Sequence, residues 1–539
     1  MRKCRSLLFI GFFFTFFVVL SAYSEISAAS KPEGELIIGI SSLGREIWSP
    51  VDGTMEEQYP AVMFYDYLLL RGTGNDEKVY PGLAEKWEVS KDKLTYTFYL
   101  RKDVKFNEGM GPFTAEDAKY SIELVGSEKS HSAFKNMVNE WIESIKVVNP
   151  HVLQVKLKSP HVDFLLNISN FQPFMMVVSK KYFEAVGPEK AGKHPIGTGP
   201  FVFKEHKAGN YLRVEAVENH WKKTSEFKTV TIKLVPELST RIAMLKAREA
   251  DAIDISTTIA EEVKASGFRL ASNPGASFYT LLFGGQVLPK REAYDPKVPW
   301  ANDKEPEKSL KVRKALSLAV NKEQIIKYIL KGNARQFGVN GFSPGSEFAD
   351  PTWKPYPYNP EEAKKLLAEA GYPKGFDKPI KMYLFTLPGR IELPDCGEVV
   401  AMDWERIGLK VDRVPIEWGA FRSGWYSRGK IHQWGTTVLG ITPFPDPLMY
   451  YKAEDIDSPH FHAFESMKTH EMIEAGLSEV EMEKRLELTK KLGQYTYDNY
   501  LCCPIAMKDT VWAVSDKVSG WTMNSLCSYL HNIQYVHRK

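Results

Sequence analysis

The residues that could do chemistry in this chain do not assemble into an enzyme's pattern. Residues 197–200, Gly-Thr-Gly-Pro, look like a phosphate-binding loop, but the lysine and the serine or threonine of a nucleotide loop are missing. A hinge-side turn is the better interpretation. We identify neither a serine-nucleophile elbow nor the His-Glu-x-x-His pair of a zinc hydrolase. We therefore predict that the protein is not an enzyme.

Histidines offer a weak pattern for metal binding. His460 and His462 alternate, so on a strand they would share one face and could bind an ion together, and His432 is the other suggestive histidine. No carboxylate or further histidine stands nearby in an order that would complete the ligands. We favour a solvent-facing loop and predict neither a metal nor a cofactor.

Four cysteines lie beyond the N-terminal segment: Cys396, Cys502, Cys503 and Cys527. They allow three connectivities, between which the sequence cannot choose. Cys502 and Cys503 are adjacent and are poor partners for each other. The Cys-x-x-Cys spacing of redox and zinc sites is absent. One structural disulfide and buried thiols remain the alternatives.

Residues 1–29 have the pattern of an export signal. A basic start is followed by an apolar run at 7–20, and Ser27-Ala28-Ala29 supplies the small residues that signal peptidase requires. The run is too short to span a bilayer comfortably. We expect cleavage near Ala29 and a protein that works in the periplasm.

The rest of the chain is nearly neutral. Removing Arg2, Lys3, Arg5 and Glu25 with the signal takes the formal net charge from +3 to +1. Nucleic-acid binding rests on clustered Lys and Arg, so a nucleic-acid partner is not expected. Cys4 precedes the apolar run, which argues against a lipid anchor, and no second long apolar run predicts a membrane span.

Strands and helices alternate in the second half of the chain, which is typical of α/β organisation. Thr114 and Asp117 form a capping box for a helix to about 124, and Asn359-Pro360 begins a helix that Gly371 ends. We predict strands at 34–41, 94–100, 147–157 (a pair), 212–217, 230–235, 380–385 and 410–415, and further helices at 240–248, 310–320, 322–330 and 397–407.

Five blocks together resemble one known family. Residues 80–123 contain PGLAEKW, TFYLRKDVKF and TAED; 194–223 contain PIGTGPF; 309–350 contain VRKALSLAVNK; 358–375 contain YNPEEAKKLLAEAG; and 398–413 contain WERIGLKV. In this order they resemble the extracytoplasmic solute-binding proteins of family 5, the peptide, dipeptide, oligopeptide and nickel-binding class of ATP-binding-cassette importers. The blocks cover nearly the whole chain after the signal.

The resemblance implies a two-lobed α/β receptor of the Venus-flytrap type with an extra inserted subdomain. Closure around a ligand would be the signal that the importer's membrane permease subunits read. A monomer is expected. The polar stretch 285–309 fits a linker or surface loop between lobes. We place lobe one at 30–70, 196–282 and 500–539, the inserted subdomain at 71–195, and lobe two at 283–499.

The resemblance also points to Arg390 as a ligand-binding residue. Some dipeptide-binding relatives carry an arginine at about this spacing after a strand, where it clamps the peptide's carboxylate. A guanidinium suits this role because its planar fork meets both carboxylate oxygens. The alternative is a surface arginine paired with Glu392 or Asp395.

The segment before Asp446 departs from the dipeptide-binding pattern. Those relatives carry Gly-Trp-x-Gly-Asp there, with the aspartate on the ligand's α-amino group, whereas this chain has Gly440-Ile441-Thr442-Pro443. Asp446 more often holds the turn than the ligand. An anionic ligand without that amine, or a peptide held mainly by its backbone, fits better than a plain dipeptide.

Aromatic residues supply the other ligand candidates, because rings give large contact area at low entropy cost. Packing in the core is the alternative for each of them. The candidates are Trp434 before the Asp446 turn, Trp418, Phe421 and Trp425 in a region that often packs on the ligand in relatives, and Arg45 and Trp48 in the loop after the first strand.

The sequence therefore predicts a periplasmic receptor that captures a peptide or peptide-like anionic small solute for import. The other solutes of the family, such as oligosaccharides, opines or nickel complexes, and a role in sensing remain alternatives. Ligand identity depends on side chains that face the space between the lobes, and the sequence does not show which these are.

Overall fold

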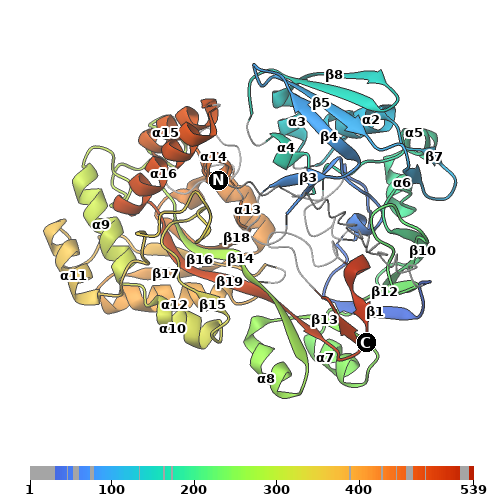
Figure 1. The fold of residues 1–539 in the computed structure, drawn as a ribbon. Coiled ribbons are helices and arrows are strands. Elements are labelled where there is room, and N and C mark those ends of the chain that lie inside the picture. Colours follow the sequence, from blue (N-terminus) through green and yellow to red (C-terminus); the bar gives the residue numbers. More distant parts are fainter. Residues whose placement is uncertain are drawn as a thin grey trace, which may run out of the picture.

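The computed structural model places the chain in two lobes joined by two long strands (Figure 1). Lobe one and the inserted subdomain lie on the right of that view, and lobe two lies on the left. The structure describes residues 31–44, 46–51, 60–72, 78–132, 134–161, 164–170, 174–387, 390–426, 429–444, 446–456, 465–479, 481–521 and 533–539. The expected signal at 1–29 lies outside them.

One large sheet runs through both lobes. The pairing of β1 (Glu35–Ile40) with β12 (Thr229–Leu234) is parallel, and so is that of β16 (Ile380–Leu384) with β17 (Val411–Pro415), which marks the α/β character of each half. In sheet order the strands are β10 (Phe201–Lys207), β11 (Tyr211–Ala216), β12 (Thr229–Leu234), β1 (Glu35–Ile40), β13 (Ala252–Ile255), β19 (Cys503–Val514), β14 (Arg269–Phe283), β18 (Gly435–Ile441), β16 (Ile380–Leu384) and β17 (Val411–Pro415), with β15 (Ala334–Arg335) beside β19.

Strands β14 and β19 form the crossing between the lobes. Their outer halves pair Arg269–Asn273 with residues 510–514 in lobe one, and their inner halves pair Ser277–Leu281 with residues 503–508 in lobe two. The register shifts between Asn273 and Ser277. Core packing changes at the same place, because Ala271 and Trp512 belong to the lobe-one core whereas Tyr279 and Ala506 belong to that of lobe two.

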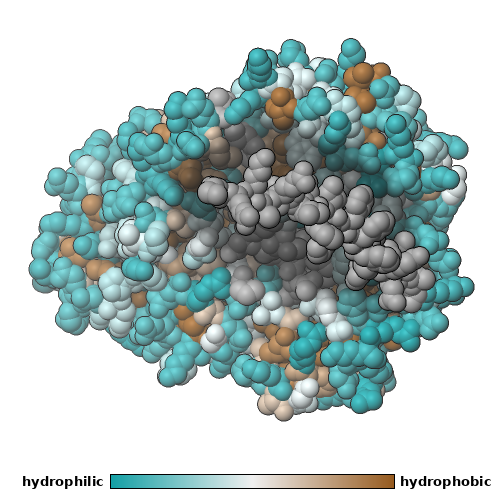
Figure 2. All heavy atoms as spheres, viewed as in Figure 1, coloured by the Kyte–Doolittle hydropathy of each residue, from teal (hydrophilic) through white to brown (hydrophobic). Residues whose placement is uncertain are grey.

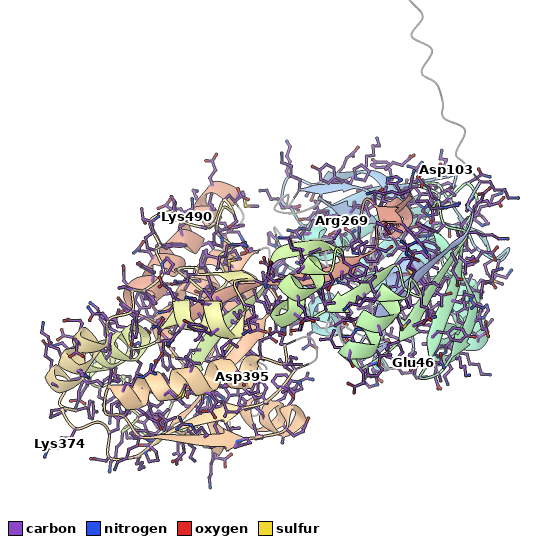
Figure 3. The ribbon with its side chains drawn as sticks, turned by 90° about the horizontal axis from the view of Figure 1, so that it is seen from below. Glu46, Asp103, Arg269, Lys374, Asp395 and Lys490 are labelled. Carbon is purple, nitrogen blue, oxygen red and sulfur yellow. The ribbon has the colours of Figure 1, made fainter. Side chains whose placement is uncertain are left out.

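The crossing lies at 274–276 and 509, so the boundaries predicted at 282/283 and 499/500 fall inside lobe two. The stretch 285–309 is not a linker, since Trp300 is fully buried in the lobe-two core and its indole N–H donates to the Gly284 oxygen at 2.6 Å. Figure 3 separates the lobes from below, with Lys374, Asp395 and Lys490 on lobe two, Glu46 and Arg269 on lobe one, and Asp103 on the inserted subdomain.

Helices cover the sheet in both lobes. Lobe one carries α5 (Lys180–Val186), α6 (Pro188–Lys193), α7 (Leu238–Lys246) and α8 (Ala260–Ala265). Lobe two carries α9 (Pro306–Leu318), α10 (Lys322–Gln324) continued by a π-helical turn (Ile325–Ile329), α11 (Pro360–Glu369), α12 (Leu393–Arg406), α13 (Trp418–Tyr426), α14 (Pro447–Ala453), α15 (Met467–Ser478) and α16 (Met482–Asp498). The helix predicted at 322–330 is therefore α-helical only in its first turn.

The inserted subdomain has a sheet and a core of its own, with Phe98, Phe113 and Leu153 at its centre. Thr114 caps its helix as predicted, since the Thr114 N–H donates to Asp117 Oδ2 at 2.9 Å. Its elements are β4 (Ala84–Val89), β5 (Thr95–Leu100), β8 (Ile142–Asn149), β9 (Val152–Leu157), α2 (Ala115–Gly126), α3 (Lys135–Trp141) and α4 (Phe164–Asn167), with the short pairs β2 (Leu69–Arg71)–β3 (Val79–Pro81) and β6 (Lys105–Phe106)–β7 (Gly111–Pro112).

The glycines of Gly-Thr-Gly-Pro join the inserted subdomain to lobe one and do not lie at the hinge between the lobes. A Cβ on Gly197 would lie 2.1 Å from the Phe64 oxygen, so only glycine fits. Asn107 of the subdomain donates its N–H to the Gly197 oxygen at 2.9 Å and its side-chain amide to the Gly199 oxygen at 3.1 Å. The segment is a structural junction, which corrects the prediction of a hinge-side turn.

Candidate ligand site at the lobe junction

Arg390 lies in the turn between β16 and α12. Its main-chain N–H donates to the Leu387 oxygen at 2.9 Å, which closes the turn. Its guanidinium donates from Nη1 to the Gly440 oxygen at 2.7 Å and from Nη2 to Thr442 Oγ1 at 3.0 Å. Both acceptors are uncharged, and no carboxylate among the described residues forms an ion pair with Arg390. The half-buried guanidinium therefore has no counter-ion within that part of the chain.

This guanidinium lies close to the crossing. Ile441, the last residue of β18, stands opposite Phe278 of β14, two residues beyond the irregular segment 274–276. The acceptors of Arg390 are therefore found at the end of β18 that meets the junction between the lobes. The alternative pairing of Arg390 with Glu392 or Asp395 is not found, because the guanidinium bonds to Gly440 and Thr442 and Glu392 pairs with Lys508.

Gly440 makes room for the arginine. A Cβ at this position would lie 2.6 Å from Cδ of Arg390 and 2.9 Å from Cε1 of Tyr279. Carbon atoms do not approach so closely, so any side chain at 440 would push one of these residues away. The missing side chain of Gly440 thus fixes the place of the guanidinium as much as the hydrogen bonds do.

A buried ion pair lies beside the arginine. Lys508 of β19 pairs with Glu392, and the side chains are 7% and 2% exposed. The Lys508 ammonium also lies 5.7 Å from the ring centroid of Tyr279, the ring against which Gly440 packs. Arg390, Lys508 and Glu392 are therefore grouped around one tyrosine, with two positive charges and one negative charge.

Burial shapes the titration of this cluster. It lowers the pKa of the Lys508 ammonium, an effect that Glu392 opposes and Arg390 adds to. Burial also raises the pKa of the Tyr279 hydroxyl well above its ordinary value, and the nearby negative charge of Glu392 raises it further. Helix α12 begins at Leu393, so the positive end of its dipole lies near Arg390. The local balance favours an added negative charge.

Asp446 is occupied by a structural role. Its Oδ1 accepts the N–H of Leu448 at 2.8 Å and caps α14, and its Oδ2 pairs with the buried guanidinium of Arg485. Both side chains are almost completely buried. The carboxylate is therefore held within lobe two, which corrects its inclusion among the ligand-binding residues.

The predicted aromatic residues of α13 form one stack. Phe421 lies 5.0 Å from Trp425 and 4.5 Å from Phe385, and Trp418 lies 5.0 Å from Phe385, measured between ring centroids. Phe421 and Trp425 are fully buried, whereas Trp418 is half-buried. In Figure 1, α13 lies on the side of lobe two nearest the inserted subdomain. Trp418 is the member of this stack with surface left for a ligand.

Trp434 and Trp48 belong to the cores of their lobes. Trp434 precedes β18 at the end opposite Ile441, packs on Trp300 and donates to Asp295 Oδ2 at 3.2 Å. Trp48 is completely buried in lobe one beside Phe64. Their burial leaves no ring face for a ligand, which corrects both predictions. Arg45 lies outside the described residues.

A carboxylate and histidine cluster in lobe two contains its own cation. Asp455, His470 and Glu474 place their ligand atoms within 4.8 Å of one another. However, the Lys452 ammonium lies 2.6 Å from Glu474 Oε1 and 3.5 Å from Asp455 Oδ2. The lysine offsets one of the two acidic charges, and His470 Nδ1 hydrogen-bonds to Asp455 Oδ2 at 2.9 Å, so the group is an ion-pair and hydrogen-bond network. His460 and His462 lie outside the described residues.

The described cysteines and His432 are buried. Cys396, Cys502 and Cys503 are free thiols whose pKa burial raises, which agrees with the buried-thiol alternative, and Cys527 lies outside the described residues. His432 Nε2 donates to the Trp425 oxygen at 2.8 Å, and burial lowers the His432 pKa to about 4. A neutral core histidine is the role that this geometry supports.

Residues 341–345, Gly-Phe-Ser-Pro-Gly, match the letters of a nucleophile elbow, contrary to the expectation that the chain contains none. The segment is a loop, in which the Ser346 N–H donates to the Ser343 oxygen at 3.0 Å, and it connects neither a strand nor a helix directly. An elbow requires a sharp strand-to-helix turn. The segment therefore matches the elbow motif in sequence but lacks its strand–turn–helix structure.

Lys508, Glu392 and Tyr279 were not predicted as part of a site. Lys508 is the one cation in the strand CPIAMKDTVWAV, and a lone lysine in an apolar strand indicates a buried partner. No feature of the sequence names Glu392 as that partner, because the two residues are far apart along the chain.

The described residues include no helix that is both long and apolar enough to span a membrane. Figure 2 shows a face that is mainly hydrophilic over both lobes, with hydrophobic residues in separate spots.

Two lobes that are connected by a pair of long strands, together with an inserted subdomain, define a solute-binding protein of the Venus-flytrap class. The chain belongs to the bacterial extracellular solute-binding proteins of family 5, whose family model matches residues 78–455. Members of this family are binding proteins and not enzymes.

Relatives of known name bind different solutes. The heme-binding protein A of Haemophilus influenzae is 27% identical over 469 residues, covering 83% of this chain and 82% of the relative. The dipeptide-binding protein of Escherichia coli is 27% identical over 530 residues, covering 93% and 94%. The nickel-binding periplasmic protein of Escherichia coli is also 27% identical, over 482 residues and 86% of each chain.

Solved structures share the fold. The periplasmic binding protein DppA of Helicobacter pylori in complex with the peptide STSA has a TM-score of 0.75 at 21% identity, covering 94% of this chain and 98% of that one. The dipeptide-binding protein of Pseudoalteromonas in complex with Met-Leu has a TM-score of 0.74 at 21% identity, covering 94% and 100%.

Proposed function

We propose that this protein is the periplasmic receptor of an ATP-binding-cassette importer and that it captures a peptide or peptide-like anionic solute. The observation that carries the proposal is the guanidinium of Arg390, held by Gly440 and Thr442 beside the crossing without a carboxylate partner among the described residues. A carboxylate of the ligand would accept its remaining N–H groups, and Trp418 would pack against the ligand's apolar part.

The site favours an anion over a zwitterion. Residues 440–443 contain no acid, and Asp446 is engaged by Arg485, so neither supplies a partner for an α-amino group. Arg390 and Lys508 outnumber Glu392 by one positive charge. A peptide would therefore be held by its carboxylate and backbone, and blocking its amine would cost little affinity.

The remaining parts of the proposal follow from the family. The pattern of residues 1–29 supports export and cleavage near Ala29. Closure of the lobes around a ligand would present a changed surface to membrane permease subunits, as the family's role in import implies. We propose binding without chemical conversion, since neither the sequence nor the described site supplies a nucleophile with its base.

The test is native mass spectrometry of the protein purified without refolding, followed by thermal unfolding with dialanine, N-acetyl-dialanine, glutathione, maltose and nickel ions. A ligand at a hundred times its dissociation constant stabilises by about 2.7 kcal/mol, which such a scan resolves. We expect an anionic adduct and stabilisation by carboxylate compounds. Stabilisation by maltose or nickel alone would refute the anionic class but leave the receptor role.

A further inference from the structure

Lys508 and Asp509 are neighbours on β19, and their side chains make contacts on opposite faces of the strand at the crossing between the lobes. Asn273 pairs with Thr510 and Ser277 pairs with Lys508, so residues 274–276 of β14 stand opposite the single residue Asp509. Such an extra stretch kinks the strand pair locally. The crossing can bend here because the regular ladder is interrupted at this point.

Asp509 closes the kink. Its Oδ1 accepts the N–H of Gly275 at 2.8 Å and lies 3.6 Å from Nη1 of Arg335 on β15. Gly275 has φ +70°, a conformation that glycine adopts without strain. The main-chain N–H of Asp509 donates to the Asn333 oxygen, and the Asn333 side chain donates to the Thr257 oxygen of lobe one at 2.9 Å.

Lys508, the preceding residue, reaches the ligand loop. Successive side chains of a strand point to opposite faces, so Lys508 points away from Asp509 and meets Glu392. Glu392 stands two residues after Arg390 and immediately before α12. A single buried ion pair thus connects the strand residue next to the kink with the loop that carries the candidate ligand-binding arginine.

We propose that the Lys508–Glu392 ion pair couples occupancy of the Arg390 site to bending at the kink, so that anion binding and lobe closure occur together. The inference rests on the proposed function of Arg390. Without ligand, Arg390 and Lys508 repel each other, and the carboxylate of Glu392 pairs with Lys508 and not with Arg390. A ligand carboxylate on Arg390 removes this repulsion, so Lys508 stays on Glu392 and the lobe-two end of β19 is fixed in one orientation.

The test compares ligand-induced contraction of the whole protein with affinity. Small-angle X-ray scattering would follow the radius of gyration of the wild type and of K508M/E392Q, with and without saturating N-acetyl-dialanine. The double substitution removes both charges together, which avoids an uncompensated buried charge. K508R keeps the charge and serves as the rescue variant, and Lys374→Ala, which removes an exposed cation of lobe two far from the crossing (Figure 3), is the control.

We expect the wild type, K508R and K374A to contract on adding N-acetyl-dialanine, and K508M/E392Q to bind about tenfold more weakly without contracting at saturation. Contraction of K508M/E392Q equal to that of the wild type would overturn the coupling and leave the proposed function standing. A wild type that neither binds nor contracts would overturn both. A purely structural role would lower the melting temperature of the unliganded variant and leave its contraction intact.

Hydrogen exchange on the wild type tests the same coupling without any substitution. Binding of N-acetyl-dialanine at Arg390 is expected to slow exchange in a peptide that spans Lys508 and Asp509. The same exchange in the presence and absence of the bound compound would overturn the proposal even if the double variant failed to fold.

Discussion

Arg390 donates to the main-chain oxygen of Gly440 at 2.7 Å and lies where a side chain at 440 would stand. The bond joins the turn before α12 to the end of β18, so it places the arginine on the sheet instead of in solvent. A guanidinium held by two neutral acceptors is pre-organised for a carboxylate, because little rotamer freedom is left to lose on binding.

Removing the guanidinium is expected to weaken binding of an anionic ligand. Arg390→Ala should lower the affinity for N-acetyl-dialanine by more than about 1.5 kcal/mol, the scale of a charge-assisted hydrogen bond. Isothermal titration calorimetry would measure this, with Lys374→Ala, which removes an exposed cation elsewhere on lobe two, as the control. Unchanged affinity in Arg390→Ala would rule out the clamp.

Adding one methyl group at position 440 should displace the arginine. Gly440→Ala would place Cβ against Arg390 and Tyr279, so we expect a loss of about 1–3 kcal/mol in the free energy of unfolding together with weaker anion binding. Thr442→Val removes one acceptor without crowding and should affect binding less. Urea unfolding and calorimetry check the two effects, and full affinity in a folded Gly440→Ala protein would contradict this geometry.

The Asp446–Arg485 pair is expected to stabilise lobe two without taking part in binding. Asp446→Asn removes the charge that faces a buried guanidinium and should cost about 3 kcal/mol, whereas D446N/R485M should recover much of it. Chemical unfolding measures the cost. A folded Asp446→Asn variant with normal stability and lost ligand binding would show that the carboxylate serves the ligand after all.

Acid should destabilise the fold through His432. Its pKa is about 4 in the folded protein and about 6.5 in the unfolded chain, so the unfolded state binds the proton first as pH falls. The stability present above pH 6.5 is therefore lost progressively towards pH 4, by about 3 kcal/mol. His432→Gln should flatten this part of the pH profile, and an equally steep profile in the variant would place the titration elsewhere.

The sequence predicted most elements because their signals are local. The capping box at Thr114 and the helix start at Asn359 need only neighbours along the chain, and both are present in the structure. The predicted lobe boundary at 282/283 lies after the crossing at 274–276 in β14, and the boundary at 499/500 lies before the crossing at 509 in β19. A strand that passes through two lobes has an apolar pattern along its whole length. In β14, only Pro274-Gly275 marks the passage from one lobe to the other.

The candidate site was only partly predictable for the same reason. Arg390 follows a strand in a loop that resembles a ligand-binding segment, so its position was recognisable. Trp434 and Trp48 share the residue type of ligand-contacting aromatics, but burial decides their role, and burial depends on Trp300 and Phe64 elsewhere in the chain. The Lys508–Glu392 pair is a contact between distant segments that no local pattern reveals.

The most direct measurement compares N-acetyl-dialanine with N-acetyl-dialanine amide by calorimetry on the wild type and on Arg390→Ala. If Arg390 receives a carboxylate, the acid should bind the wild type at least about tenfold more tightly than the amide, and Arg390→Ala should remove the difference. Equal affinity of the acid and the amide for the wild type would contradict the account.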